Sequence, residues 1–229
     1  MRKQLGDHLK PTAGEHGMDL GCGTGLYSSV LAPTQTPITL VDSSIAMMAE
    51  ATQPTRGDSL RLIPVCASAE EIAEGTKDLP YPAYGAILAK EVLHHVDPAR
   101  RATVLTGLAK LLAPGGRMVV TMLPKEITYP LWPAALERFT ARQPDPETVI
   151  AHMREAGLEA NVAAATFVLS LSLEQWCQKV QERFMSLLSS FTDVELADGI
   201  ARIKASAPGP QLAVDDQWVF VTGTRPTGT

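Results

Sequence analysis

Three glycines, at positions 21, 23 and 25, alternate with other residues directly after a short apolar run. A glycine-rich turn lets a ligand approach the backbone at places where a β-carbon would collide with it. The spacing is GxGxG, and Leu26 stands where a dinucleotide-binding fingerprint would carry its third glycine. The stretch therefore indicates a ligand-binding turn and disfavours a nicotinamide oxidoreductase.

Two acidic residues close to this turn restrict the kind of ligand. Asp19 lies two residues before the first glycine, and its carboxylate is a poor neighbour for a diphosphate and a good one for an ammonium group. Asp42 ends the next expected strand, where an acid can accept hydrogen bonds from both hydroxyls of a ribose. These residue types predict a nucleoside ligand that carries a positive charge.

Two adjacent histidines, His94 and His95 in "LHHV", are the candidates for moving a proton near this ligand. A neutral amine or hydroxyl must lose a proton when it attacks an electrophile, and an imidazole titrates in the range that suits such a base. One of the rings could instead pack beneath the loop and bond to a backbone carbonyl. We prefer His95 as the base.

An alternation of strands and helices must position these residues. Strands are expected at 17–21, 37–42, 60–68, 84–91 and 117–123, and helices at 24–32, 43–52, 69–75 and 97–116. Pro114, Gly115 and Gly116 are expected to end the last of these helices. Such an alternation is typical of a mostly parallel sheet with helices on both faces, and these sheets bind ligands at the carboxyl ends of their strands.

The sequence at this point resembles the class I S-adenosylmethionine-dependent methyltransferases. The similar segments are "DLGCGTG" (19–25), "LVDSS" (40–44), "VCASAEE" (65–71), "YGAILAKEVLHHVDP" (84–98) and "LLAPGGRMVVTML" (111–123). The resemblance implies an α/β fold with a Rossmann-like seven-stranded sheet, and S-adenosyl-L-methionine as the cofactor. It predicts one domain over 1–229, with a cofactor-binding core at 15–124, a closing strand at 215–225, and substrate lid or insertion segments at 125–143 and 172–208.

The resemblance also implies which residues contact the cofactor. The methionine part would lie against Asp19, Gly21, Cys22, Gly23 and Gly25, the ribose against Asp42 and Ser43, and the adenine against Ser68, Ala69 and Glu70. Ser68 stands where relatives usually carry an aspartate, although a hydroxyl can still accept a hydrogen bond. Lys90 begins the loop that passes under the sulfonium, and it could point to solvent, pair with Glu91 or meet an anionic substrate.

Aromatic residues are the candidates for binding the methyl acceptor. Tyr27 either lines the substrate pocket or is a half-buried core side chain. Trp132 and Trp176 lie in the predicted lid segments, where an amphipathic helix is expected over 172–191. That helix could instead be core packing. If it is a lid, it predicts an apolar pocket for an aromatic or otherwise hydrophobic small molecule.

Charge and composition argue against nucleic-acid partners, metal sites and membrane spans. The net charge is −5 and the basic residues are scattered, which disfavours nucleic acid as a partner. The three cysteines are dispersed, which argues against a disulfide framework or a metal site and fits a reducing cytoplasm. No apolar run approaches the roughly 18 residues that a membrane span needs. We expect a cytoplasmic monomer or homodimer with a small-molecule acceptor.

Three functions stay open. The first is transfer of a methyl group to an oxygen or nitrogen atom of a small molecule of specialised metabolism. The second is methylation of a macromolecule, such as a tRNA or a protein, by the same fold. The third is a protein that binds the cofactor without transferring its methyl group, such as a cyclase, because binding motifs and chemistry are separable.

Overall fold

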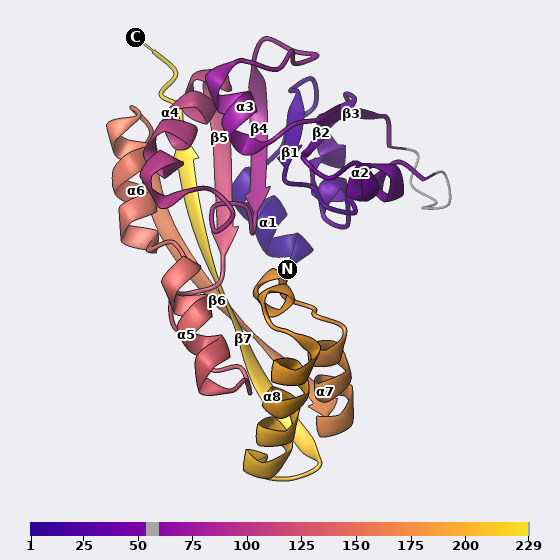
Figure 1. The fold of residues 1–229 in the computed structure, drawn as a ribbon. Helices are drawn as coiled ribbons and strands as arrows, with labels where there is room; N and C mark the ends of the chain where they lie inside the picture. Colours follow the sequence, from indigo (N-terminus) through magenta and orange to yellow (C-terminus); the bar gives the residue numbers. More distant parts are fainter. Residues whose placement is uncertain (54–59, 229) are drawn as a thin grey trace. The chain divides into compact units, whose positions relative to one another are not determined.

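The computed structural model describes residues 1–53 and 60–228 (Figure 1). The chain forms two compact units. The first unit is Met1–Met122, Pro144–Ala163 and Val219–Thr229, and the second unit is Leu123–Gln143 and Ala164–Trp218. The grouping of both into a single domain stays a prediction. Among the described residues, no helix is long and apolar enough to cross a membrane.

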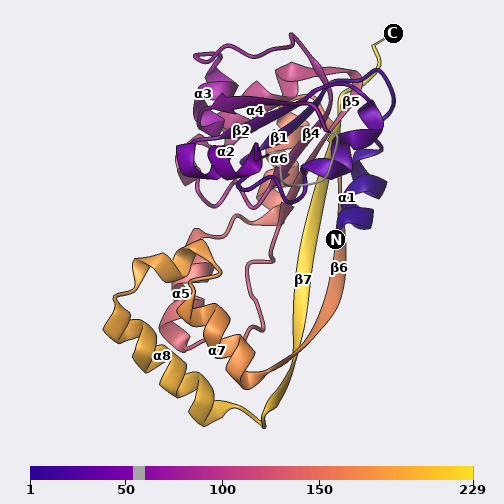
Figure 2. The same cartoon turned by 90° about the vertical axis from the view of Figure 1, so that its right-hand side faces the viewer.

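One seven-stranded sheet carries the fold (Figure 1, and turned in Figure 2). Its strands are β1 (Gly17–Leu20), β2 (Ile38–Asp42), β3 (Leu62–Cys66), β4 (Tyr84–Lys90), β5 (Leu112–Met122), β6 (Glu159–Ser172) and β7 (Gln211–Thr224). The order is β3-β2-β1-β4-β5-β7-β6. Strands β1 to β5 pair with one another in parallel, and β7 pairs antiparallel with β5. This confirms the predicted α/β fold with a mostly parallel seven-stranded sheet.

The helices of the first unit precede β1 or lie between its strands in the sequence. They are α1 (Arg2–Leu9), α2 (Ile45–Ala51), α3 (Ala69–Glu74), α4 (Arg101–Leu111) and α6 (Pro146–Glu155), with the 3₁₀ helices η1 (Ser28–Thr34) and η3 (Pro98–Arg100). Polar side chains cap their first turns: the Ser44 hydroxyl accepts a hydrogen bond at α2 and the Asp97 carboxylate accepts one at η3. These caps fix where the chain turns from strand to helix.

Two expected features of the first unit are wrong. The α-helix expected over 24–32 is replaced by turns and the 3₁₀ helix η1, because Gly23 and Gly25 adopt left-handed φ angles that no α-helix contains. The Pro-Gly-Gly stretch at 114–116 does not end α4 but lies inside β5. It occupies an irregularity in the ladder, where the register to β4 shifts between Tyr84 and Ala86.

The core of the first unit is buried up to the carboxyl ends of the central strands. All residues of β4 are buried except its last, Lys90, and all residues of β2 are buried except its last, Asp42. Side chains that follow these positions therefore emerge at one edge of the sheet. This is the edge at which parallel α/β sheets bind ligands.

The second unit contains α5 (Pro133–Arg142), α7 (Leu173–Gln181), η4 (Ser186–Ser190) and α8 (Asp193–Ser206), together with residues 164–172 of β6 and 211–218 of β7. The single helix expected over 172–191 is wrong. The α-helix ends at Gln181, because Arg183 adopts a left-handed φ of 56° and the chain continues as η4. Thr192 and Glu195 form a capping box at the start of α8.

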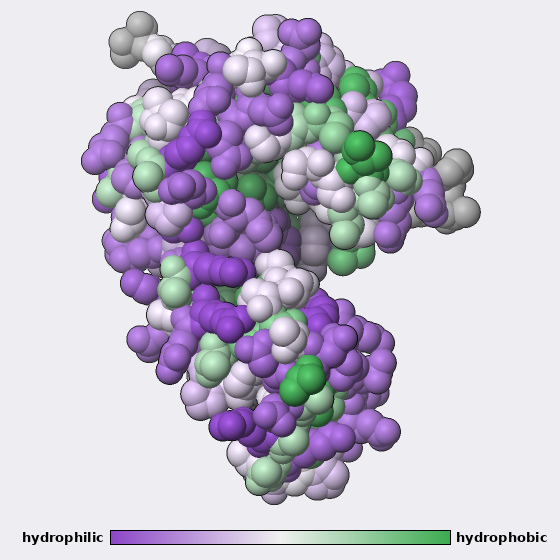
Figure 3. Space-filling model, viewed as in Figure 1, coloured by the Kyte–Doolittle hydropathy of each residue, from purple (hydrophilic) through white to green (hydrophobic). Residues whose placement is uncertain are grey.

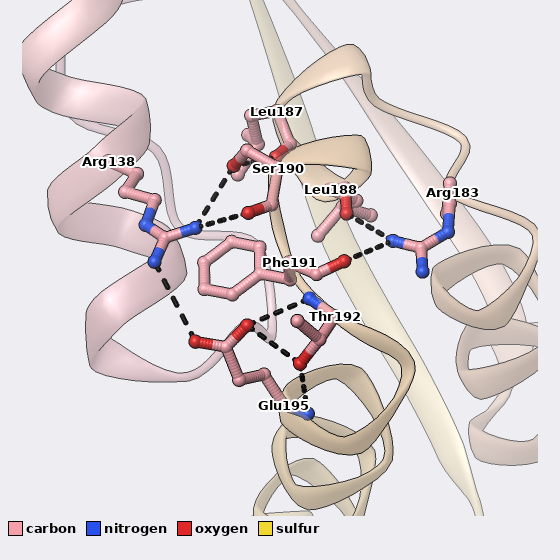
Figure 4. A network of polar contacts seen from close by, with 8 residues as sticks. All are labelled: Arg138, Arg183, Leu187, Leu188, Ser190, Phe191, Thr192 and Glu195. Carbon is pink, nitrogen blue, oxygen red and sulfur yellow. Dashed lines mark hydrogen bonds and ion pairs between the residues drawn. The ribbon is translucent and has the colours of Figure 1, made fainter.

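Two arginines hold the segment 186–193 of the second unit (Figure 4). The Arg183 guanidinium donates hydrogen bonds to the carbonyls of Leu188 and Phe191 and to the Asp193 carboxylate. The Arg138 guanidinium, from α5, lies over the Phe191 ring with its central carbon 3.8 Å from the ring centroid and donates to the Ser190 carbonyl at 2.8 Å. The left-handed turn is therefore maintained by side-chain hydrogen bonds.

Replacing Arg183 with glutamine is expected to lower the free energy of unfolding by about 2 kcal/mol, because the hydrogen bonds from a charged donor to Leu188, Phe191 and Asp193 are lost. Urea denaturation followed by tryptophan fluorescence measures the change, since Trp132 and Trp176 both lie in this unit. Lys179→Gln removes the same charge from an exposed position of α7 and is the control. Equal stabilities of the two variants would contradict the role given to Arg183.

Candidate functional site

The glycine turn follows β1 at the carboxyl edge of the sheet. Gly21, Gly23 and Gly25 have φ angles of +64°, +53° and +74°, a region that side-chain-bearing residues rarely adopt. A β-carbon at Gly21 would lie 2.5 Å from Cγ2 of Val92, so this glycine lets the turn pack against the loop after β4. At Gly23 no heavy atom of the described residues beyond its two chain neighbours lies within 4 Å of such a carbon. The turn is thus closely packed at its first glycine and borders open space at its second.

Asp42, the last residue of β2, ties this turn to the start of α2. One carboxylate oxygen accepts a hydrogen bond from the Gly23 amide at 2.8 Å, and the other accepts one from the Ser44 amide at 2.8 Å. Each oxygen retains a second lone pair that can accept another hydrogen bond. Asp42 can therefore hold the turn in place and accept hydrogen bonds from a pair of ligand hydroxyls, with exposed Ser43 beside it.

Asp19 lies behind the turn in β1, with only 3% of its surface exposed. Its Oδ2 accepts a hydrogen bond from the Ser28 hydroxyl at 2.6 Å. Burial raises the pKa of Asp19 to about 7 and the Asp42 charge acts in the same direction, while the Ser28 hydrogen bond and the Lys90 charge lower it. A cationic ligand group that reaches this carboxyl would favour its ionised form.

Cys22 is a buried packing residue of the turn. Its amide donates to the Val41 carbonyl at 2.9 Å, and its sulfur lies 3.6 Å from the sulfur of Met48. Burial raises the pKa of its thiol, and the nearby Asp19 and Asp42 charges raise it further. Because the thiolate is the reactive form of cysteine, this environment disfavours Cys22 as a nucleophile.

Lys90 and Tyr27 meet beside the glycine turn. In the ladder between β1 and β4, Asp19 pairs with Leu88 and Leu20 with Ala89, so Lys90 stands next in register to the first glycine of the turn. The Lys90 ammonium lies 4.8 Å from the centroid of the Tyr27 ring, a cation–π contact. Both side chains are partly exposed. The structure thus places these two predicted site residues together with Asp19.

The segment after β3 reaches the same edge, because Cys66 pairs with Asp42 in the ladder between β2 and β3. Ser68 here begins α3: its hydroxyl accepts from the Glu71 amide at 3.1 Å, and the Glu71 carboxylate accepts from the Ser68 amide at 2.8 Å. This capping role was not predicted, although its signal, a serine three residues before a glutamate, was present in the sequence. Ala69 is buried and Glu70 is half-buried.

The loop after β4 carries the two histidines. His94 is half-buried and His95 is exposed, with their ring centroids 4.0 Å apart. The Arg101 guanidinium donates to the carbonyls of Leu93 and Val96 on either side of them, at 3.0 and 3.3 Å. Arg101 therefore fixes the loop that presents the histidines, and no sequence motif had singled it out.

Glu91, which the sequence suggests only as a partner for Lys90, gives this loop its first turn. Its φ is +57°, and its amide donates to the Thr121 carbonyl at 2.8 Å. A left-handed backbone at a residue other than glycine costs energy and persists only when the surrounding structure imposes it. The chain therefore leaves β4 by a strained turn, directly between Lys90 and the histidines.

The two predicted acceptor-binding tryptophans lie in the core of the second unit. Trp176 is 1% exposed, and its indole N–H donates to the Pro130 carbonyl at 2.7 Å. Trp132 is 6% exposed and packs edge-on against Phe191, with ring centroids 4.9 Å apart. These contacts are typical of core packing, and contact of either ring with an acceptor stays a prediction.

The surface around the glycine turn is apolar in places. Leu26, Ile45 and Met47 are 51%, 77% and 43% exposed, and they flank the turn and the start of α2. The face of the molecule drawn in Figure 3 is otherwise mostly hydrophilic, with hydrophobic residues scattered over it. A cavity of about 530 Å³ adjoins the turn, lined among others by Gly25, Leu26 and Ser29. Among the described residues, no cluster of three or more metal-ligating side chains occurs.

Comparison with known proteins connects these features to a family. Residues 18–118 match the family described as "Methyltransferase domain". The chain is 32% identical over 145 residues to the O-methyltransferase resE of Aspergillus sclerotiorum. The aligned region covers 61% of this chain and 51% of that protein. It is also 35% identical over 120 residues to a ubiquinone biosynthesis O-methyltransferase of Caulobacter. This aligned region covers 52% of this chain and 44% of that protein.

Among solved structures, the [4+2]-cyclase SpnF has the same fold, with a TM-score of 0.63 and 21% sequence identity over 99% of this chain and 80% of that one. At this level of identity the likeness concerns the fold alone. The chain spans about half the length of these two curated relatives.

Proposed function

We propose that this chain, through residues 18–118 a member of the class I S-adenosylmethionine-dependent methyltransferases, transfers the methyl group of that cofactor to an oxygen or nitrogen atom of a hydrophobic or aromatic small molecule. The observation that carries the proposal is the glycine turn, with Asp42 tied to its second glycine and buried Asp19 behind it. The relatives that are named O-methyltransferases favour oxygen as the acceptor atom.

The residues at this edge of the sheet fit the cofactor. A backbone that turns through left-handed glycines beside open space can accept a bulky ligand, and both oxygens of Asp42 can accept hydrogen bonds from the ribose hydroxyls. We propose that Asp19 binds the ammonium of the methionine end, and that the segment 68–70, which follows β3 at the same edge of the sheet, contacts the adenine. The bound cofactor supplies a methyl group on a positively charged sulfur, which leaves as a neutral thioether.

We propose His95 as the general base. Its ring is the more exposed of the pair, on a loop that Arg101 holds through the flanking carbonyls. His95 would accept the proton of an acceptor hydroxyl as that oxygen takes the methyl group that the bound cofactor would supply. The main task of the remaining residues is to hold the two reactants in line.

Replacing His95 with alanine is expected to lower kcat by about a hundredfold, because the proton then has no positioned acceptor. Binding of S-adenosylhomocysteine, measured by calorimetry, should not change. Raising the pH toward the ionisation of the acceptor hydroxyl should restore part of the rate. The control is His152→Ala, on α6 and bonded to Glu155. If kcat fell in His94→Ala and was unchanged in His95→Ala, the general base would be His94 instead.

Transfer of a labelled methyl group tests the proposed function itself. The full chain is incubated with methyl-labelled S-adenosylmethionine and, separately, with phenols and catechols, aromatic amines, bulk tRNA and a protein extract. The expected result is label in one of the small-molecule sets. Label only in tRNA or protein would favour the macromolecular acceptor, and firm cofactor binding without any transfer would favour a non-transferase such as a cyclase.

A further inference from the structure

We propose that Lys90 binds the carboxylate of the cofactor's methionine end, as the positive counterpart of Asp19, which faces the ammonium of the same group. The inference rests on the proposed function and assigns a role that motif resemblance does not give to a lysine at this position. The observation behind it is that the Lys90 ammonium and the Asp19 carboxyl both lie beside the glycine turn, where the amino acid part of the ligand would bind.

The sheet register places both charges on one face. Asp19 pairs with Leu88 across β1 and β4, and Lys90 follows two residues later. Because side chains two residues apart on a strand point to the same side, Lys90 emerges on the face that carries Asp19. It does so at the last residue of β4, where the strand stops being buried. The two charges are close enough for the lysine to lower the pKa of the Asp19 carboxyl.

Tyr27 limits where the lysine side chain can lie. The ammonium is 4.8 Å from the centroid of the tyrosine ring, and Tyr27 itself immediately precedes η1, whose first residue, Ser28, is bonded to Asp19. A cation held over an aromatic face can still contact an anion on its outer side. The contact therefore holds a long, flexible side chain beside the turn before any ligand arrives.

The chemistry of the ligand matches this pair of charges. The methionine end is a zwitterion, so it needs an anionic partner for its ammonium and a cationic partner for its carboxylate. Without Lys90 the ligand carboxylate would approach the Asp19 carboxylate with no positive charge from Lys90 to balance it. With Lys90 the site is complementary to both halves of the zwitterion.

The test compares two ligands that differ by one carboxylate. Calorimetry of the full chain measures the affinities of S-adenosylhomocysteine and of S-adenosyl-3-thiopropylamine, its decarboxylated analogue, with wild type, Lys90→Met and Lys90→Arg. We expect the wild type to prefer S-adenosylhomocysteine by about tenfold or more. Lys90→Met should lose this preference while keeping its affinity for the decarboxylated analogue, and Lys90→Arg should retain most of the preference.

Unchanged affinity for the decarboxylated analogue shows that Lys90→Met is folded. If that variant does not fold, Lys90→Gln, which also removes the positive charge, is compared with wild type in the same way. An equal loss for both ligands, or a preference that survives in Lys90→Met, would overturn the inference, and an effect of the substitution on acceptor KM alone would assign Lys90 to an anionic acceptor. Wild-type protein that binds neither ligand would instead contradict the proposed function.

Discussion

Replacing Asp19 with asparagine is expected to weaken the binding of S-adenosylhomocysteine by about a hundredfold and to make the unliganded protein more stable at pH 8. The first effect follows because an amide cannot balance the charge of the ligand's ammonium, and removal of one partner of a buried charged pair costs about 2–5 kcal/mol. The second effect has the opposite sign because Asp19 is a buried carboxyl that the fold itself disfavours when ionised.

The pH dependence of stability follows from the raised pKa of Asp19. Its pKa rises from the ordinary 3.8 to about 7 on folding, so between these values the folded state holds a proton that the unfolded state has lost. The contribution of this group to stability is therefore lost as the pH rises from about 4 to about 7. Above pH 7 the folded state bears the full free-energy cost of the ionised Asp19 carboxylate. This cost is on the order of 1.4 kcal/mol for each pH unit of the shift, or a few kcal/mol in total.

Urea denaturation at pH 5 and pH 8 checks this prediction. The amide oxygen that Asp19→Asn introduces can still accept the Ser28 hydrogen bond, so the stability advantage of this variant over wild type should be larger at pH 8 than at pH 5. The matched control is Asp198→Asn, an exposed residue of α8, which should show no such difference. A stability advantage that is the same at both pH values would contradict the assignment of a raised pKa to Asp19.

Replacing Gly21 or Gly23 with alanine is expected to damage two different properties. Both positions have left-handed φ angles, so both variants should lose about 1 kcal/mol of stability from backbone strain. At Gly21 the new methyl group also lies 2.5 Å from Val92, and the resulting overpacking should add about 1–3 kcal/mol. At Gly23 the methyl group points into the space that the ligand would occupy, so affinity should fall further than stability.

The expected outcome is therefore a pair of contrasting variants. Gly21→Ala should be the less stable in urea, and Gly23→Ala should fold but bind S-adenosylhomocysteine at least about tenfold more weakly than wild type. Gly6→Ala, in α1, is the control, because beyond its chain neighbours and the backbone of its own helix no described atom lies within 4 Å of the new carbon. If Gly23→Ala bound the ligand as tightly as wild type, the open space beside the turn would not be the binding site.

Much of the fold could be predicted because it depends on local patterns. Short apolar runs alternating with capped helices predict a parallel α/β sheet, and Ser44, Asp97 and Thr192 cap helices as their residue types indicate. The departures arise where tertiary contacts override local preference. Arg183 ends α7 through hydrogen bonds to residues farther along the chain, which no periodicity reveals.

The residues of the candidate site likewise fall into those that the sequence predicts and those that it does not. Asp19, Asp42 and the glycines were predicted from type and spacing, and the structure brings them together at one edge of the sheet. Arg101 acts through backbone carbonyls, and carbonyls are present at every residue, so the sequence carries no signal for this role. The contact between Lys90 and Tyr27 depends on the register of β1 and β4, which a single sequence does not specify.

The central claim is that the glycine turn and Asp42 form the binding site of an adenosyl cofactor. Isothermal titration calorimetry of S-adenosylhomocysteine into the full chain tests it most directly, on protein whose cooperative urea transition shows that it is folded. The predicted result is saturable binding of one ligand molecule per chain. Folded protein that takes up neither S-adenosylhomocysteine nor S-adenosylmethionine would contradict the claim.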